Sequence, residues 1–187
     1  MNSGKNLFVI TGGPGSGKTT LLRELVQQGF GCVPEVARQI IQEQVRGGGT
    51  ALPWADRALY ARRMPERSVH SYQQHASALH PTFFDRGIPD TLAYARLIGL
   101  KDHQAIGRAC DEFRYASPVF LAPAWAEIYE TDSERKQDFE EATRTYALLA
   151  ETYQECGYEV LEIPRTAPQE RAEFIVKRLR AMANALL

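Results

Sequence analysis

Short apolar runs alternate with longer stretches of mixed polarity along the whole chain. The apolar runs predict five strands, at about residues 7–10, 31–33, 82–84, 119–121 and 159–163. The stretches between them predict helices at about residues 18–28, 37–46, 55–79, 89–98, 102–115, 134–155 and 168–185. Strands that alternate with helices in this way are typical of an α/β fold, in which helices cover both faces of a parallel sheet.

Three local signals refine this prediction. Residues 47–49 are consecutive glycines, which indicate a flexible connection. Pro65 lies inside the predicted helix 55–79 and should kink or divide it, because proline lacks the N–H that a helix needs. The apolar positions of the closing segment recur in helical register and predict a helix packed on the sheet; they are Ala172, Ile175, Val176, Leu179 and Met182.

The composition is that of an ordinary globular chain, with 44% hydrophobic and 24% charged residues. A length of 187 residues suffices for one domain with a sizeable core and is short for two, so we expect a single domain over residues 1–187. The formal net charge of −1 does not indicate nucleic acid or an acidic membrane as a partner.

Two further absences narrow the class of protein. No stretch approaches the length of a membrane span, and the N-terminal residues lead into the first predicted strand without a long apolar segment, so we expect a cytoplasmic protein. Cys32, Cys110 and Cys156 are odd in number and far apart, and they indicate neither a disulfide framework nor a zinc site.

The clearest chemical signal follows the first predicted strand. Residues 12–19 read GGPGSGKT, the complete pattern G-x-x-x-x-G-K-T, between an apolar strand and a predicted helix. Glycines let the backbone curl around a polyphosphate and aim several N–H groups at it. The pattern therefore predicts a loop that binds a nucleoside triphosphate. The residues expected to contact it are Gly13, Pro14, Gly15, Ser16, Gly17, Lys18, Thr19 and Thr20.

Two side chains of this loop have distinct expected roles. Lys18 should reach the β- and γ-phosphates of ATP as a point charge, and we expect it to contact phosphate rather than core. Thr19 should offer its hydroxyl to Mg²⁺, which prefers oxygen ligands and bridging phosphates. Asp85 ends the third predicted strand and is expected to hold or orient the same ion, while the adjacent Arg86 grips a transferred or acceptor phosphate. A plain strand-ending turn is the alternative for these two residues.

A second carboxylate follows the second predicted strand. Glu35 ends a strand that we expect to lie beside the strand before the loop, at the sheet edge where ligands of open α/β sheets bind. It could accept a proton from an attacking hydroxyl or hold a metal-bound water. The alternative is that Glu35 caps the helix that follows it. Arg38, one turn along, could meet an anionic acceptor.

A basic segment at about residues 130–140 follows the fourth predicted strand. Arg135 and Lys136 fit a lid that closes over a transferring phosphoryl group, with Arg144 as a further candidate. A solvated, charged start of a helix would look the same. Trp54 and Trp125 could stack a ring of the substrate, although aromatic residues in loops commonly pack locally.

These motifs together resemble known families. Asp85-Arg86, with Asp90 and Tyr94 after it, resembles the aspartate-arginine motif of thymidylate kinases and is similar to the glutamate-arginine motif of deoxynucleoside kinases, which also keep a glutamate at the place of Glu35. The whole chain resembles the P-loop ATPase/kinase domain family that includes the nicotinamide riboside kinase part of the bacterial NAD regulator, and within it a group of small bacterial AAA-type ATPases. The resemblance implies a three-layer P-loop NTPase sandwich with strand order 2-3-1-4-5.

Three functions remain open at this level. The first is an ATP- and Mg²⁺-dependent kinase that acts on a nucleoside-like or other small acceptor, whose pocket the insertion at about residues 47–79 would build. The second is a regulatory NTPase, and the third is a nucleotide-dependent binding module. The chain has neither the Asn-Lys-x-Asp nor the Asp-x-x-Gly motif of regulatory GTPases. Neither the acceptor nor the oligomeric state follows from the sequence.

Overall fold

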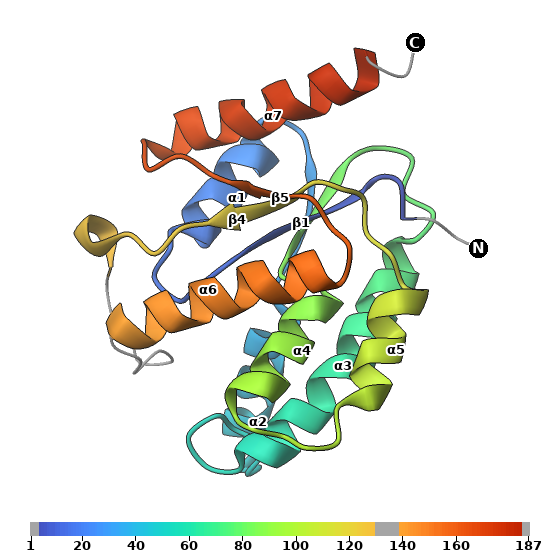
Figure 1. Cartoon of the computed structure of the whole chain (residues 1–187), viewed down its shortest axis with the longest axis vertical. Coiled ribbons are helices and arrows are strands. Elements are labelled where there is room, and N and C mark those ends of the chain that lie inside the picture. The colour runs from blue at the N-terminus through green and yellow to red at the C-terminus, as the bar shows by residue number, and fades with distance from the viewer. Residues whose placement is uncertain (1–3, 130–138, 185–187) are drawn as a thin grey trace.

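The computed structural model describes residues 4–129 and 139–184 and has a parallel sheet at its centre (Figure 1). The strands are β1 (Leu7–Gly12), β2 (Gly31–Val33), β3 (Thr82–Asp85), β4 (Val119–Ala122) and β5 (Val160–Glu162). Their order is β2-β3-β1-β4-β5, and all four neighbouring pairs are parallel. The predicted α/β class and the strand order that the resemblance implied are both confirmed.

Seven α-helices and one short 3₁₀ turn, η1, connect and cover the strands within the described ranges. They are α1 (Lys18–Gln27), α2 (Val36–Gly47), α3 (Arg57–His75), α4 (Ile88–Leu97), α5 (Gln104–Glu112), η1 (Ala126–Ile128), α6 (Phe139–Glu155) and α7 (Pro168–Asn184). The predicted start of the sixth helix, at 134, lies outside the described residues. None of the described helices is long and apolar enough to cross a membrane.

The sequence predicts that Pro65 kinks or divides its helix, and the structure shows that it does not divide α3. The helix runs without interruption from Arg57 to His75 with the proline inside it. Proline removes one backbone hydrogen bond, but the same helix buries side chains on either side of that position, among them Met64 and Ser68. Tertiary packing of this face therefore holds the helix together across the missing bond.

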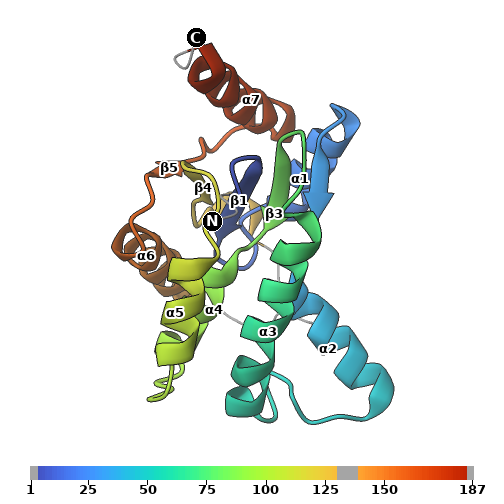
Figure 2. The same ribbon diagram turned by 90° about the vertical axis from the view of Figure 1, so that its right-hand side faces the viewer.

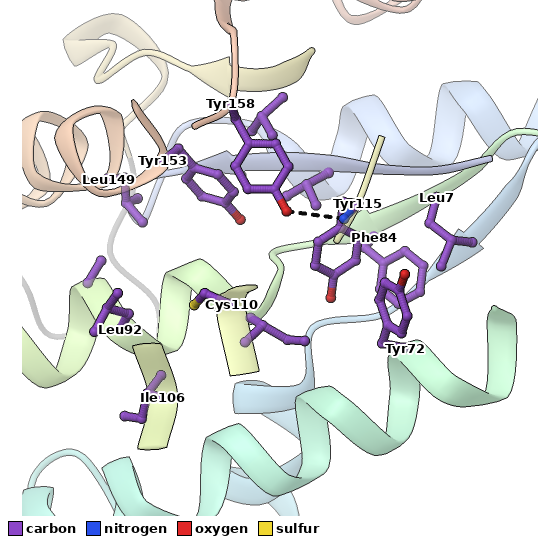
Figure 3. Packing of buried hydrophobic residues seen from close by; sticks show 14 of the residues in the cluster. Leu7, Tyr72, Phe84, Leu92, Ile106, Cys110, Tyr115, Leu149, Tyr153 and Tyr158 are labelled. Carbon is purple, nitrogen blue, oxygen red and sulfur yellow. Dashed lines mark hydrogen bonds between the residues drawn. The ribbon is translucent and has the colours of Figure 1, made fainter. Parts of the chain in front are cut away.

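The sheet is buried on both faces because successive side chains of each strand point to opposite sides. Leu7 and Val9 of β1 belong to the core that α4, α5 and α6 cover, whose residues surround Tyr115 and Tyr153 (Figure 3). Phe8 and Ile10 belong to the core under α1 and α7. The predicted packing of the closing helix is confirmed, since Ala172, Ile175 and Val176 are buried and Leu179 and Met182 pack against them.

Helices α2 and α3 extend beyond the carboxyl edge of the sheet as a pair, with the connecting loop at their far end (Figure 2). They enclose a third, separate cluster of apolar residues: Ile40, Ile41, Leu52, Tyr60, Ala61 and Met64. Tyr94 of α4 and two residues that follow this helix, Ile98 and Leu100, pack against the cluster from outside the pair. The predicted insertion, at about residues 47–79, thus supplies the connecting loop and α3 of a helical projection with its own small core, and α2, which precedes the insertion, supplies the other helix.

The strand order corrects one expectation about Glu35. Strand β2 pairs with β3, and β3 in turn pairs with β1, so β3 separates Glu35 from the strand before the glycine-rich loop. In the register, Ile10 of β1 lies beside Asp85 of β3. The carboxyl ends of the three strands still meet at one edge of the sheet, and the residues that follow them form the candidate site.

Candidate functional site

Two glycines of the loop between β1 and α1 have no room for a side chain. A Cβ atom on Gly13 would lie 2.7 Å from the carbonyl oxygen of Ala142 in α6, a backbone group that cannot easily move. Gly17, the residue before α1, has φ 75°, and a Cβ there would lie 2.7 Å from a nitrogen of Arg171. Glycine at these positions is thus required by the approach of α6 and α7 as well as by the curl of the loop.

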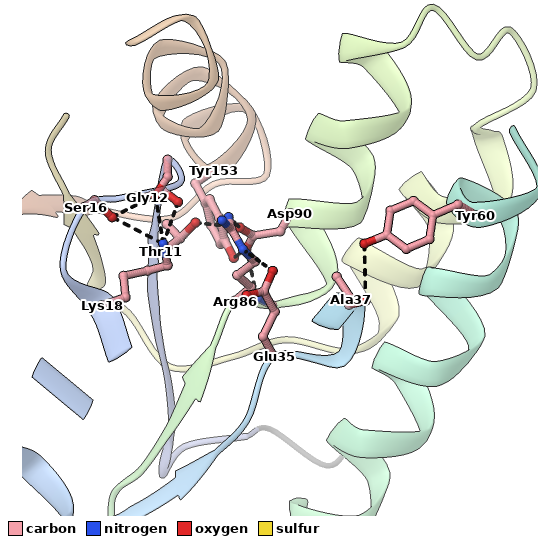
Figure 4. A network of polar contacts seen from close by, with 12 residues as sticks. Thr11, Gly12, Ser16, Lys18, Glu35, Ala37, Tyr60, Arg86, Asp90 and Tyr153 are labelled. Atoms are coloured by element: carbon pink, nitrogen blue, oxygen red, sulfur yellow. Dashed lines mark hydrogen bonds and ion pairs between the residues drawn. The ribbon is translucent and has the colours of Figure 1, made fainter. Parts of the chain in front are cut away.

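Lys18 is more deeply buried than we expected, with 3% of its surface exposed. Its Nζ donates to the carbonyl oxygens of Gly12 and Gly13, both at 2.9 Å, and to Ser16 Oγ at 3.2 Å. The ammonium of Lys18 therefore lies against the backbone of the loop, between Gly12, Gly13 and Ser16 (Figure 4). The two threonines that follow Lys18 differ in exposure, since Thr19 is half-buried and Thr20 is exposed.

Asp85 is a buried carboxyl at the end of β3, 9% exposed. Burial, and after it the charge of Glu35, raises its pKa from 3.8 to about 6, although Lys18 lowers it. Its Oδ1 atom is buried and has no hydrogen-bond partner among the described residues. An orphaned carboxylate oxygen is costly unless it has a ligand, and Asp85 lies beside Ile10 in the sheet, two residues before the loop begins at Gly12.

This orphaned oxygen fits the Mg²⁺ ion that the loop implies. Within the described residues no group of three or more His, Cys, Asp or Glu side chains could hold a metal by itself. Mg²⁺ in nucleotide sites characteristically has only one or two protein ligands, and phosphate oxygens and water fill the other positions. Asp85 and the hydroxyl of Thr19 would supply such a sparse set of oxygen ligands.

Arg86 links two carboxylates, that of Glu35 after β2 and that of Asp90 in the first turn of α4. Its Nε donates to Glu35 Oε1 at 2.9 Å, and its terminal nitrogen donates to Asp90 Oδ1 at 2.9 Å (Figure 4). Burial lowers the pKa of the guanidinium, but Glu35 and Asp90 outweigh it and raise the pKa. Arg86 has φ 71°, the left-handed region, which no other non-glycine residue in the described ranges adopts. The ion pairs hold this unfavourable backbone in place.

Asp90, in the first turn of α4, receives hydrogen bonds from four groups. Thr11 Oγ1 donates to it at 2.6 Å, the hydroxyl of Tyr153 at 2.5 Å and the backbone N–H of Gly87 at 2.9 Å, in addition to the bond from Arg86. Sequence reasoning missed Thr11 and Tyr153 as members of the site. Thr11 carried one signal, since it is a polar residue at the end of an otherwise apolar strand.

Glu35 occupies the N-cap position of α2, yet its side chain makes no capping hydrogen bond. It is directed at Arg86 instead, with 15% of the side chain exposed. The capping alternative therefore does not describe what this carboxylate does. Asp56 shows the contrast, since its side chain does accept from the N–H of Leu59 at the start of α3.

A cavity of about 520 Å³ opens from the loop toward α2 and α3. Its inner end includes Pro14 of the loop together with Glu35, Asp85 and Arg86. Its far end is apolar and aromatic. Tyr60 and Tyr94 meet there edge to face, with ring centroids 5.4 Å apart. Residues from the predicted insertion, Trp54 and Met64 among them, complete this end.

The structure brings together most but not all of the predicted site residues. Arg38 and Arg144 line the cavity, and Trp54 lies at its rim with 47% of its surface exposed. Thr145, also in the wall, has a buried hydroxyl without a partner among the described residues. Trp125 is half-buried beside η1 and is not part of the wall. Arg135 and Lys136 of the predicted lid lie outside the described residues.

Comparison with known proteins gives a family and a fold. A family model described as "AAA domain" matches residues 7–171. No curated protein matches the sequence. Among solved structures, the chain is similar to the NadR protein in complex with NR, with a TM-score of 0.73 and 17% sequence identity over 96% of this chain. The similar region is 52% of that protein, so this chain spans about half of NadR's length.

Two shorter enzymes match over nearly their whole length. The deoxyadenosine kinase from M. mycoides has a TM-score of 0.68 and 15% identity, with 94% of this chain and 99% of that chain covered. The thymidylate kinase from Ehrlichia chaffeensis has a TM-score of 0.62 and 16% identity, with 95% and 99% covered. At these identities the likeness shows a P-loop kinase-like fold.

Proposed function

The chain belongs to the AAA domain family of P-loop proteins, and from that premise we propose that it transfers the γ-phosphoryl group of ATP to a hydroxyl of a small, nucleoside-like acceptor. The observation that carries the proposal is the continuity of the cavity with the glycine-rich loop. Its wall includes Pro14 of the loop at one end and the Tyr60–Tyr94 pair at the other. A ring held at the aromatic end would present its polar substituents toward the loop.

The nucleotide half of the site rests on the loop and its lysine. The backbone N–H groups from Gly15 to Thr20 and the helix N-terminus of α1 suit a triphosphate. Lys18 would contact this triphosphate once its ammonium leaves the carbonyl oxygens of the loop. Thr19 and Asp85 would hold Mg²⁺, which supplies a positive charge for the β- and γ-phosphates when bound. The half-buried Thr19 and the orphaned Asp85 oxygen support this assignment.

The acceptor half rests on Glu35 and Arg86. Glu35 would orient the acceptor hydroxyl and accept its proton, since it lies in the cavity wall and its side chain is not used as a helix cap. Arg86, fixed by Glu35 and Asp90, would present its charge to the phosphoryl group in transfer. Arg135 remains in the proposal as a lid residue.

The cavity is also the reason to prefer a kinase to the other two functions. A regulatory NTPase needs only to position a water beside the triphosphate, and a binding module needs no ordered carboxylate at all. Neither function accounts for an aromatic-ended cavity that begins at the loop, with Glu35 and Arg86 paired in its wall.

The proposal is tested by incubating the protein with γ-labelled ATP, Mg²⁺ and a panel of nucleosides, nucleotides and other hydroxyl-bearing metabolites. Label should appear in at least one acceptor, and none should appear with the Lys18→Met variant. A reaction without any acceptor measures hydrolysis. Release of inorganic phosphate that no acceptor changes would replace the kinase by the regulatory NTPase. Binding of ATP without either reaction would favour the binding module.

A further inference from the structure

Arg171, in the first turn of α7, reaches across to the glycine-rich loop. Both of its terminal nitrogens donate to the carbonyl oxygen of Ser16, each at 3.1 Å. The guanidinium packs so closely on Gly17 that a Cβ there would lie 2.7 Å from it. Figure 1 shows α7 alongside α1, the helix that begins immediately after this loop, and the cores of the two helices are shared. The contact therefore joins the far end of the chain to the nucleotide loop.

Among the described residues, no acidic side chain pairs with the buried charge of Arg171. Only 2% of Arg171 is exposed, and none of the ion pairs within residues 4–129 and 139–184 includes it. Its Nε atom is buried without a hydrogen-bond partner, and burial lowers the pKa of the guanidinium. A buried cation that meets only one carbonyl oxygen is unfavourable unless an anion comes near it. The glycine-rich loop that Arg171 contacts is the proposed site of the triphosphate, which is such an anion.

We propose that Arg171 is a positioning residue for the triphosphate, which acts through the peptide group that joins Ser16 to Gly17. The oxygen of that peptide accepts both bonds from the guanidinium, and its N–H belongs to Gly17, one of the donors that such a loop aims at phosphate. The inference rests on the nucleotide-binding half of the proposed function and does not depend on the acceptor.

The physical link is polarisation of the peptide. A carbonyl that accepts charge-assisted hydrogen bonds withdraws electron density from its own N–H, which then becomes a stronger donor. The phosphate in turn supplies the negative charge that the buried guanidinium lacks. Binding at the loop and the contact of α7 therefore strengthen each other. Because both bonds go to one oxygen, the effect should be confined to ligands that place a phosphate at Gly17.

The experiment measures affinities for MgATP and for inorganic tripolyphosphate, which has neither base nor ribose, by calorimetry. Arg171→Met keeps the length of the side chain and removes its charge. It should weaken binding of both ligands by about tenfold, the equivalent of one charge-assisted hydrogen bond. Arg171→Lys keeps a charged donor and should recover part of the loss. Arg178→Met removes the same charge from an exposed position of α7 and should bind both ligands like the wild type.

NMR of the Ser16–Gly17 peptide group separates this positioning role from a role in which Arg171 only stabilises the packing of α7. In the free protein, the amide proton resonance of Gly17 should move upfield in Arg171→Met and stay in place in Arg178→Met, because the first variant alone loses the polarising contact. In the wild type, tripolyphosphate should shift the Nε–H resonance of Arg171. This second measurement needs no variant, so it decides the matter even if Arg171→Met does not fold.

Two results would overturn the inference: a folded Arg171→Met variant that binds both ligands within twofold of the wild type, or an Arg171 Nε–H resonance that saturating tripolyphosphate does not move. Failure of the wild type to bind either ligand would overturn it together with the nucleotide half of the proposed function. Tight binding without transfer to any acceptor would end the kinase proposal and leave this inference standing.

Discussion

The guanidinium of Arg86 donates to the carboxylate of Glu35 across 2.9 Å, which joins the residue after β3 to the residue that precedes α2. The two side chains were predicted as independent candidates, one for an anionic group and one for a hydroxyl. As a pair they hold each other in the cavity wall, and the left-handed backbone of Arg86 depends on this contact and on Asp90. A change in either residue therefore alters the position of the other.

Replacement of Lys18 by methionine should remove triphosphate binding. The variant keeps the apolar stem and removes the ammonium that would meet the phosphates, with an expected loss of at least about a hundredfold in affinity. It also removes the donor to the carbonyls of Gly12 and Gly13, so the free protein should melt at a lower temperature. Calorimetry with MgATP and thermal unfolding measure the two effects.

Lys177→Met serves as the control for the loss of a lysine, since Lys177 is exposed on α7. Triphosphate affinity that survived in the Lys18 variant would remove this side chain from the proposed mechanism.

The raised pKa of Asp85 predicts how stability depends on pH in the absence of metal. The folded protein holds a proton on this carboxyl up to about pH 6, whereas an unfolded chain releases it near 3.8. The native state binds more protons in this interval, so this group makes the free energy of unfolding fall as the pH rises from about 4 to about 6. Asp85→Asn should remove that slope. Urea unfolding in EDTA at several pH values tests it, and an identical slope in the variant would refute it.

The same Asp85→Asn variant should require more Mg²⁺. An amide oxygen carries no charge and is a weaker ligand for a hard cation, so the Mg²⁺ concentration for half-maximal turnover should rise on the order of tenfold. The affinity for metal-free ATP should change less. Turnover that persisted in excess EDTA in the wild type would show that the proposed metal site is wrong.

Glu35→Gln should separate the catalytic interpretation from a structural one. The amide keeps the shape of the side chain but cannot accept a proton, so acceptor-dependent turnover should fall by roughly 10²–10⁴-fold while ATP affinity changes little. A capping role would instead cost about 1 kcal/mol of stability at near-normal turnover. Glu155→Gln controls for the loss of an ion pair. It removes the carboxylate of the last residue of α6, which pairs with Arg96 at 2.6 Å.

Tyr153→Phe should show how much the buried network around Asp90 contributes. The variant fills the same space but removes the hydroxyl that donates to Asp90 at 2.5 Å, with an expected loss of about 1–3 kcal/mol in the free energy of unfolding. Tyr158→Phe is the matched control, because it removes a buried hydroxyl of the same core that accepts from the N–H of Tyr115 (Figure 3). Both should lose stability, and only Tyr153→Phe should also lower acceptor-dependent turnover.

The sequence was sufficient for the elements and the loop because both depend on local pattern. The predicted bounds of all five strands lie within two residues of the observed ones, because buried parallel strands form uninterrupted apolar runs in the sequence. The contacts of Asp90 could not be found in the same way. They come from β1, the turn before α4 and α6, and Tyr153 is 63 residues distant in the chain.

Arg171 illustrates the same limit more strongly. In the sequence it is one charged residue of the closing helix, and nothing in the local pattern indicates a contact with the loop. Its burial and its bonds to Ser16, 155 residues away, depend on how α7 crosses α1. The far end of the cavity shows the same limit, since the sequence indicated an insertion but not which of its side chains line the cavity.

The separate core of α2 and α3 has a consequence for how this protein could diversify. Ile40, Tyr60 and Met64 pack mainly against one another and α4, away from the two cores that hold the sheet. The far end of the cavity is thus made by a segment whose internal packing can be rebuilt while the nucleotide machinery is inherited unchanged. In evolution or in the laboratory, the helical projection is the place where a new acceptor could be accommodated by exchanging one continuous piece of chain.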